Sequence, residues 1–299
     1  MNNCRLCPFE CEVDREKIFG RCNASTFIHI VRARPHFGEE PCISGERGSG
    51  TIFFSGCALR CVYCQNYKIS REEKGKEFSA EEFAKFLIVY AKSGVHNINL
   101  VTPSHYADKI TQALILSRDK IDIPIIWNSS GYEKTETLKK LSGLIDIYLM
   151  DSKYYSPEVS ERYSGTRDYF EINLKALSEI FLQQPKNIYD NNGLLVRGVI
   201  VRHLILPSNT FDSRCILRNL KKNFSENITL SLMCQYTPLG DARFFPEINR
   251  RLKRKEFNIV YDTLVSLGYK NGYIQSFSSA DDSYVPDFDI IDIYGIGNN

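Results

Sequence analysis

The chain has 299 residues, and 38 Lys and Arg against 36 Asp and Glu give it a formal net charge of +2. This balance excludes the strong global field by which some proteins hold nucleic acids or anionic membranes. No window approaches the roughly 20 apolar residues of a transmembrane helix, and the N-terminus lacks an apolar signal core. Ten cysteines in such a chain indicate metal ligation in a reducing compartment. We therefore expect a soluble cytoplasmic metalloprotein without a membrane or nucleic-acid partner.

The first pattern along the chain is a group of four cysteines near the N-terminus. A C-x2-C-x3-C-x10-C spacing places them at Cys4, Cys7, Cys11 and Cys22. Four thiolates can close a tetrahedral zinc site, and so short a segment needs a staple of this kind to hold a fold. Zinc is the first expectation, with an iron site or second cluster, or unligated thiols, as alternatives. Residues 1–45 are assigned to this cysteine-rich metal-binding segment.

A second cysteine group follows a short apolar run, Thr51–Ser55. It consists of Cys57, Cys61 and Cys64, with Tyr63 just before the last cysteine. Three thiols at this spacing can converge on one metal centre from a single loop. A closed zinc site and a cubane cluster each take four ligands, so one coordination position is left for something that is not protein. The alternatives are a zinc site completed by a distant residue, or three packed thiols.

From residue 51 the chain alternates apolar strands with helical patterns. Strands are predicted at Thr51–Ser55, Asn97–Thr102, Ile123–Asn128, Ile145–Asp151, Leu195–Leu206 and Ile228–Cys234, with a short seventh run at Gly272–Phe277. Helices are predicted at Ala80–Ser93, Ala107–Arg118, Glu133–Leu141, Glu171–Gln183, Arg214–Lys222 and Lys253–Leu267. Ser79 and Glu82 have the spacing of a capping box at the first helix. This alternation predicts an α/β protein with a parallel sheet.

Polar residues interrupt the apolar strands at their carboxyl ends, where parallel barrels place their chemistry. The four stretches are Thr102–His105, Asn128–Gly131, Asp151–Lys153 and Arg202–His203. Asp151 and Lys153 are two residues apart, so they project on the same face as Ile147 and Leu149. A purely structural Asp–Lys pair is the alternative to a functional role. His105 and Gln235 are weaker candidates for facing a substrate, because a solvated loop histidine is the more common case.

The cysteine spacing and its neighbours resemble one protein family. The C-x3-C-x-aromatic-C pattern of residues 57–64 is similar to the radical S-adenosylmethionine (SAM) superfamily. The stretches Gly45–Cys57, Asn97–Pro103 and Asp146–Tyr154 resemble the branch named for pyruvate formate-lyase activating enzymes. The resemblance implies a partial (β/α)6 TIM-type barrel over residues 46–277, preceded by the cysteine-rich segment. An acidic tail at 278–299 is expected either to dock as a strand or to remain loose.

The same resemblance implies cofactors and the residues that contact them. Cys57, Cys61 and Cys64 would hold a [4Fe-4S] cluster whose free iron binds SAM. The expected SAM contacts are made by Tyr63 against the adenine, Asn128 and Ser129 at the ribose and methionine carboxylate, Lys153 at that carboxylate, Arg202 beside SAM and substrate, and Thr102. Thr102 would replace a Gly-Gly-Glu-Pro stretch of the family, which this chain lacks. No catalytic residue is assigned.

The two cations also have a physical argument of their own. Lys153 and Arg202 lie late on strands whose other inward residues are apolar, and a buried cation is costly unless it is paired. Asp151 is too close to Lys153 in sequence to pair the arginine as well. We therefore expect both cations to help hold the carboxylate of SAM, or a substrate beside it, by charge-assisted hydrogen bonds.

The expected function is reductive cleavage of SAM to a 5′-deoxyadenosyl radical that abstracts hydrogen from a substrate. The first form of this hypothesis is activation of a glycyl-radical enzyme. The alternatives are radical modification of a peptide, an RNA or a small metabolite, and a non-catalytic zinc or iron–sulfur binding module. The enzymatic forms imply an external one-electron reductant of flavodoxin or ferredoxin type as a partner.

Overall fold

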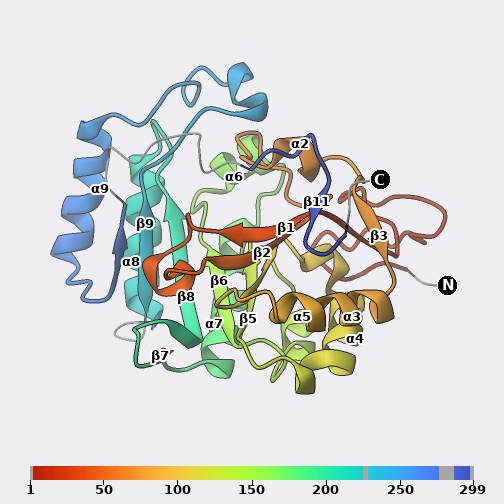
Figure 1. Cartoon of the computed structure of the whole chain (residues 1–299). Helices are drawn as coiled ribbons and strands as arrows, with labels where there is room; N and C mark the ends of the chain where they lie inside the picture. Colours follow the sequence, from red (N-terminus) through yellow and green to blue (C-terminus); the bar gives the residue numbers. More distant parts are fainter. Residues whose placement is uncertain (1–2, 225–227, 276–285, 297–299) are drawn as a thin grey trace.

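The strands of the protein join into one sheet in the computed structural model, which describes residues 3–224, 228–275 and 286–296. The order along the sheet is β10-β9-β8-β6-β5-β4-β2-β1-β11, and the short β3 and β7 pair with β1 and β8 (Figure 1). The strands are β1 (Ile28–His36), β2 (Ser49–Phe54), β3 (Lys76–Phe78), β4 (Ile98–Val101), β5 (Ile125–Ser129), β6 (Ile147–Asp151), β7 (Ile188–Tyr189), β8 (Leu195–Leu204), β9 (Thr229–Met233), β10 (Gly272–Ile274) and β11 (Asp292–Ile293).

The α-helices are α1 (Pro41–Ser44), α2 (Tyr67–Ser70), α3 (Ala80–Ala91), α4 (Ala107–Ser117), α5 (Thr135–Lys140), α6 (Pro157–Ser164), α7 (Tyr169–Gln183), α8 (Thr210–Phe224) and α9 (Arg254–Ser266). The helices α3, α4, α5, α7, α8 and α9 connect strands of the sheet and pack on its outer face (Figure 1). Short 3-10 helices of the described residues, η1 (Ser104–Tyr106), η2 (Arg118–Lys120) and η4 (Gly240–Phe244), lie in the connections. No helix in the described ranges is long and apolar enough to cross a bilayer.

The core of the sheet is parallel, as the strand–helix alternation predicts. Each of β2, β4, β5, β6, β8 and β9 pairs in parallel with the next, and β10 adds a further parallel strand beside β9. The six predicted strands are found close to their predicted bounds. The seventh is confirmed at β10, while residues 276 and 277 lie outside the described ranges. The architecture is therefore a partial (β/α)6 barrel of TIM type with an added strand.

Local signals explain where helices begin. Ser79 caps α3: its Oγ accepts the backbone N–H of Glu82, and the Glu82 carboxylate accepts the N–H of Ser79 at 2.8 Å. The predicted capping box is thus confirmed. Such a cap satisfies backbone donors that the helix itself leaves free, which stabilises a helix by about 1 kcal/mol.

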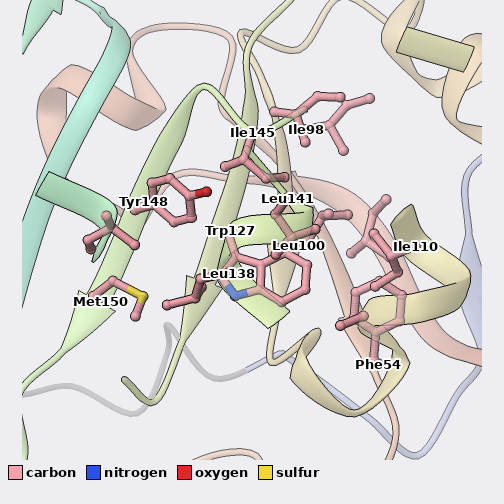
Figure 2. Close-up of a cluster of buried hydrophobic side chains, with 14 of the residues drawn as sticks. Phe54, Ile98, Leu100, Ile110, Trp127, Leu138, Leu141, Ile145, Tyr148 and Met150 are labelled. Atoms are coloured by element: carbon pink, nitrogen blue, oxygen red, sulfur yellow. The ribbon is translucent and has the colours of Figure 1, made fainter. Parts of the chain in front are cut away.

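Side chains of the parallel strands alternate between two buried layers. On the outer face, Trp127 is fully buried among aliphatic and aromatic side chains of the strands and of helices α4 and α5 (Figure 2). On the inner face, Ile126, Leu149 and Ile200 form a smaller cluster with Ile43 of α1. This inner layer is the apolar floor on which the candidate site is built.

Two of the strands beyond the predicted set extend the sheet past β2. β1 pairs antiparallel with β2, although the sequence analysis groups its residues with the cysteine-rich segment. β11, from the acidic tail, pairs with β1, and Asp292 bridges Arg32 at 3.2 Å and Arg34 at 2.6 Å. The described part of the tail therefore docks as a strand, whereas its Asp281 and Asp282 lie outside the described ranges.

Candidate active site at the carboxyl ends of the parallel strands

A cavity of about 470 Å³ opens at the carboxyl ends of the parallel strands, directly above the inner apolar layer. It is lined from the loop after β2, the ends of β4, β5, β6, β8 and β9, and β10. The residues predicted for the cluster and for SAM all line it: Cys57, Cys61, Tyr63, Cys64, Thr102, Asn128, Ser129, Lys153 and Arg202. Residues separated by almost 150 positions in sequence are thus brought to one site.

The loop that carries the three cysteines is held by backbone contacts to the N-terminal segment. The N–H of Cys57 donates to the carbonyl oxygen of Cys22 at 3.1 Å. Gly56, just before it, has φ +80°, and a Cβ there would lie 2.5 Å from the same oxygen. Only glycine allows both this backbone conformation and this close approach. Cys57, the first cysteine of the loop, is therefore placed by the N-terminal cysteine segment.

His105 supports the same loop from the other side. Its side chain is buried, and its Nε2 contacts the carbonyl oxygen of Ser55 at 2.7 Å. Burial lowers the pKa of His105 to about 3, so the ring is neutral and its Nε2–H is the donor. The expectation of a substrate-facing or solvated histidine is wrong, because His105 lies under the cysteine loop and not in the cavity. Gln235, its companion in that expectation, does line the cavity.

The three thiols lie close enough to influence one another. Burial, followed by the neighbouring Cys64 and Cys61, raises the pKa of Cys57 to about 12, and burial and Cys61 raise the pKa of Cys64. Within the described ranges, no three or more His, Cys, Asp and Glu side chains already converge as metal ligands. The fit to a cluster therefore rests on donor chemistry: three thiols of one loop, facing one cavity, that need a metal's positive charge to ionise.

Lys153 lies beside these thiols and is paired within the protein. Its Nζ is 2.5 Å from Oδ2 of Asp151. Burial alone would lower the pKa of Lys153, but the Asp151 carboxylate and the Cys61 and Cys64 sulfurs outweigh burial and raise it. The predicted shared face is confirmed, since both residues line the cavity above Leu149. A charged ammonium group is thus fixed next to the cysteine loop.

Arg202 has partners within the protein that were not expected from the sequence. Its Nε donates to Oε1 of Glu40 at 2.9 Å, and its Nη2 contacts carboxylate oxygens of both Glu39 and Glu40. Burial alone would raise the pKa of Glu40, yet the Arg202 guanidinium holds it below its usual value. The buried arginine therefore has carboxylate partners from the segment before α1 and does not require that of SAM. The expectation that a bound carboxylate neutralises Arg202 is therefore wrong, because Glu39 and Glu40 already do so.

Thr102 has an unusual backbone at the end of β4. Its φ of +59° lies in the left-handed region, which a β-branched residue rarely adopts. Its N–H donates to the carbonyl oxygen of Asn128 at 2.8 Å, which fixes the turn over the end of β5. Backbone strain of this kind costs about 1–3 kcal/mol and gathers at functional sites. The strain marks Thr102 as a residue whose backbone, more than its side chain, shapes the cavity.

The end of β5 is packed tightly against β6. The N–H of Gly131 donates to Oγ of Ser129 at 3.2 Å, and that hydroxyl also contacts Sδ of Met150 at 3.3 Å. A Cβ at Gly131 would lie 2.0 Å from the carbonyl oxygen of Asp151. The hydroxyl of Ser129 is therefore engaged inside the protein, which leaves Asn128 as the freer polar side chain at this strand end.

Tyrosines enclose the aromatic residue of the cysteine loop. The ring of Tyr63 is buried and lies 5.9 Å from that of Tyr236, 6.3 Å from Tyr163 and 6.4 Å from Tyr154, all edge-on. Edge-to-face rings at these separations stabilise one another. Tyr63 therefore presents a fixed aromatic surface to the cavity.

The N-terminal cysteines form a second group next to the first. Burial is the largest cause of a rise in the pKa of Cys7 to about 12. A backbone hydrogen bond from Phe9 acts in the opposite sense, and the other three thiols raise the pKa further. The backbone N–H of Cys4 donates to Val13, and that of Glu12 returns to Cys4, which closes the segment into a compact hairpin. None of the ten cysteines, all of them described, forms a disulfide. The group has the donors for a metal, and the metal stays a prediction.

Sequence reasoning missed one wall of the cavity. Glu39, Glu40, Ser231 and Tyr273 also line the cavity, beside Arg202 and the ends of β9 and β10. Nothing local in the sequence marks the two glutamates, because their partner Arg202 lies more than 160 positions away. The only available signal was the acidic pair directly before Pro41.

Comparison with known proteins agrees with this arrangement. The family model described as the radical SAM superfamily matches residues 51–186. An uncharacterized protein of Methanocaldococcus jannaschii is 32% identical over 265 residues, covering 85% of this chain and 72% of its own. The pyruvate formate-lyase-activating enzyme of Clostridium pasteurianum is 27% identical over 225 residues, covering 72% of this chain and 87% of its own.

Solved structures show the same fold at low sequence identity. Methylornithine synthase aligns with a TM-score of 0.50 and 15% identity, over 82% of this chain and 70% of that one. SuiB of Streptococcus suis, bound to S-adenosylmethionine, aligns with a TM-score of 0.50 and 12% identity, over 74% of this chain and 48% of its own. At such identities the likeness is one of fold alone.

Proposed function

This chain belongs to the radical SAM superfamily, and from that premise we propose that it is an activating enzyme that abstracts a hydrogen atom from a glycyl-radical partner enzyme. The observation that carries the proposal is the shared cavity, which is lined by three loop cysteines, by Tyr63 of the same loop and by five residues at the ends of four strands. The similarity to an activating enzyme of Clostridium pasteurianum supports the choice of substrate class.

The residues have distinct tasks in this proposal. Cys57, Cys61 and Cys64 would hold the [4Fe-4S] cluster that the family implies. Lys153 would hold the methionine carboxylate of SAM, and Tyr63 would lie against its adenine. When bound, the cluster and SAM together supply reductive cleavage of the sulfonium to methionine and a 5′-deoxyadenosyl radical.

What the chain itself contributes is orientation and the exclusion of water. The ammonium group of Lys153 is already fixed by Asp151, so little reorganisation is needed when a carboxylate arrives. The tyrosines around Tyr63 bury the cysteine loop on one side. A reactive radical generated there would meet apolar and aromatic walls in preference to water.

The reaction also requires an electron from outside the protein. We propose a flavodoxin- or ferredoxin-type reductant as its source. Cys4, Cys7, Cys11 and Cys22 are proposed to hold a structural metal that supports the loop at Cys57, with zinc as the predicted ion.

A second candidate substrate class is favoured by one observation. Glu39, Glu40 and Arg202 form a group of ion-paired side chains in the wall of the cavity. Such a group can recognise polar groups of a peptide or small metabolite. In this second candidate function the radical chemistry is the same, and only the bound substrate differs.

Isotope transfer tests the choice between the two. The reconstituted protein is incubated with SAM, a reductant and a candidate glycyl-radical enzyme deuterated at its glycine Cα positions. Activation predicts a glycyl radical signal in electron paramagnetic resonance and deuterium in the 5′-deoxyadenosine. Formation of unlabelled 5′-deoxyadenosine without that signal, across the glycyl-radical enzymes of the source organism, would contradict activation and favour the second class.

A further inference from the structure

The cysteine loop has two faces, and only one of them belongs to the cavity. Cys57, Leu59 and Cys61 line the cavity, whereas the residues between them, Ala58 and Arg60, do not. Val62 also turns away: its backbone N–H donates to Tyr163 at 2.9 Å, and its carbonyl oxygen accepts the N–H of Asp241 at 2.8 Å. A single stretch of backbone thus separates the cavity from the outer face of the loop.

Three arginines from different segments gather on this outer face. Arg21 donates from Nε to the carbonyl oxygen of Ala58 and from Nη2 to that of Ser164, both at 2.9 Å. Arg60 belongs to the loop itself. Arg71 follows α2 and is tied to the N-terminal segment, because Nδ2 of Asn23 donates to its carbonyl oxygen at 2.7 Å. All three side chains are partly exposed.

The charges in this group do not balance. Arg71 is paired with Asp241, while Arg21 is held by carbonyl oxygens and the ring of Phe9 at 4.3 Å. Arg60 forms no ion pair with a described residue, and its Nε is buried without a hydrogen-bond partner. Three guanidinium groups therefore face one carboxylate.

The backbone reinforces this placement. Arg60 has φ +53°, a left-handed conformation that long side chains seldom adopt. Arg60 is therefore a cation without a carboxylate partner among the described residues, held in a strained backbone conformation beside two other arginines. An anionic partner on the outer face would relieve the repulsion and satisfy the guanidinium.

We propose that Arg21, Arg60 and Arg71 form the docking surface for an acidic one-electron carrier protein that reduces the centre held by the cysteine loop. The inference rests on the proposed function and adds where the electron enters. One electron leaves the reduced carrier, crosses the loop from its outer face, and reaches the cavity side. Carboxylates of the carrier would pair with the guanidinium groups and keep the substrate side of the loop free.

Electrostatics gives the surface a measurable signature. Opposite charges steer association and raise its rate at low ionic strength, and salt screens this effect over about 10 Å at 0.1 M. Binding of the carrier should therefore weaken with added salt, and weaken further when the charge of Arg60 is removed.

The test uses the reconstituted full chain with flavodoxin hydroquinone as one reductant and dithionite as the other. Arg60→Asn removes the charge and Arg60→Asp reverses it, with residues that tolerate a left-handed backbone. Arg60→Lys keeps the charge, and Arg197→Gln changes an exposed arginine near the start of β8, at the opposite end of the barrel. Binding of oxidised flavodoxin is measured separately by titration, so that one readout does not depend on activity.

The proposal predicts that Arg60→Asp slows flavodoxin-driven SAM cleavage about tenfold or more at low salt and weakens flavodoxin binding in parallel. Cleavage driven by dithionite, a small reductant that needs no docking, should stay at the wild-type rate. Arg60→Lys should keep most of the wild-type flavodoxin-driven rate and affinity, and Arg197→Gln should keep both unchanged. Unchanged flavodoxin affinity in Arg60→Asp would overturn the docking surface. Absence of cleavage by the wild type with dithionite would instead contradict the proposed function, while the titration would still decide the docking surface.

Discussion

Cys57, the first cysteine of the cavity loop, donates its backbone N–H to the carbonyl oxygen of Cys22, the last cysteine of the N-terminal group. The hydrogen bond is 3.1 Å long, and Gly56 lets these two segments of the chain approach each other this closely. Two cysteine groups that look independent in the sequence are thus mechanically connected. The order of the N-terminal segment should therefore affect the cavity loop.

The first prediction follows from this connection. Cys22→Ser should release the N-terminal metal and expose residues 1–26 to protease, because structural metal binding is coupled to folding. It should also lower the iron bound by the distant loop, since the carbonyl oxygen of residue 22 would no longer be held in place. Metal analysis and limited proteolysis measure both effects. Cys215→Ser, in helix α8, is the matched control, and a fully protected segment in metal-free Cys22→Ser would contradict the prediction.

The second prediction concerns Lys153 and SAM. Lys153→Met should weaken SAM binding about ten- to a hundredfold, because one charge-assisted hydrogen bond contributes about 1.5–3 kcal/mol. The double variant Asp151→Asn/Lys153→Met controls for the unpaired Asp151 carboxylate that the single variant leaves. Equilibrium titration of SAM, with iron content and thermal stability recorded, is the measurement. Wild-type affinity in both variants would assign Lys153 to the structure alone.

The third prediction separates Arg202 from Lys153. Arg202→Met should destabilise the fold by about 3–5 kcal/mol, because it leaves Glu39 and Glu40 buried without their partner. Neutralising both glutamates as well, in Glu39→Gln/Glu40→Gln/Arg202→Met, should recover much of that loss. Chemical unfolding of the three proteins measures it. If Arg202→Met were as stable as the wild type, the ion group would not be structural.

The fourth prediction is a pH dependence that originates at His105. Its pKa is about 3 in the folded protein against 6.5 normally, so between these values only the unfolded chain binds the proton. Stability must therefore fall as the pH is lowered from 6.5, by up to about 1.4 kcal/mol per pH unit from this residue. Unfolding free energies at pH 6.5 and 5 should differ less in His105→Gln than in the wild type. His36→Gln, at a partly exposed position, should keep the wild-type difference, and equal differences in all three would contradict the assignment.

The parts of the fold that could be predicted are those with local signals. Apolar runs identify β5 and β6 because each is buried on both faces, and Ser79 with Glu82 marks the start of α3. β1 was missed because a register shift between Ile30 and Arg32 breaks its apolar alternation, and because its outward positions include two charged residues, Arg32 and Arg34. Their partner Asp292 lies at the other end of the chain. A strand whose polar face is satisfied by so distant a residue has no local signature.

The candidate site also contains residues whose environment could be predicted from the sequence and residues whose environment could not. Lys153 could be placed because two-residue spacing fixes it on the face of Leu149, whatever the rest of the chain does. The environment of Arg202 could not, because Glu39 and Glu40 reach it only through the folded barrel. For His105, sequence indicates a loop histidine but not that Ser55 needs a donor. Residue types were predictable there, and their partners were not.

Cys57, Cys61 and Cys64 are proposed to hold the centre at which SAM is reduced. Anaerobic reconstitution with iron and sulfide, followed by addition of SAM and dithionite and quantification of 5′-deoxyadenosine, tests this role. The wild type should show [4Fe-4S] absorbance and form 5′-deoxyadenosine. The Cys57→Ala/Cys61→Ala/Cys64→Ala variant should lose both while keeping the metal of its N-terminal cysteines. A variant that retained the cluster, or a fully loaded wild type that left SAM intact, would contradict the account.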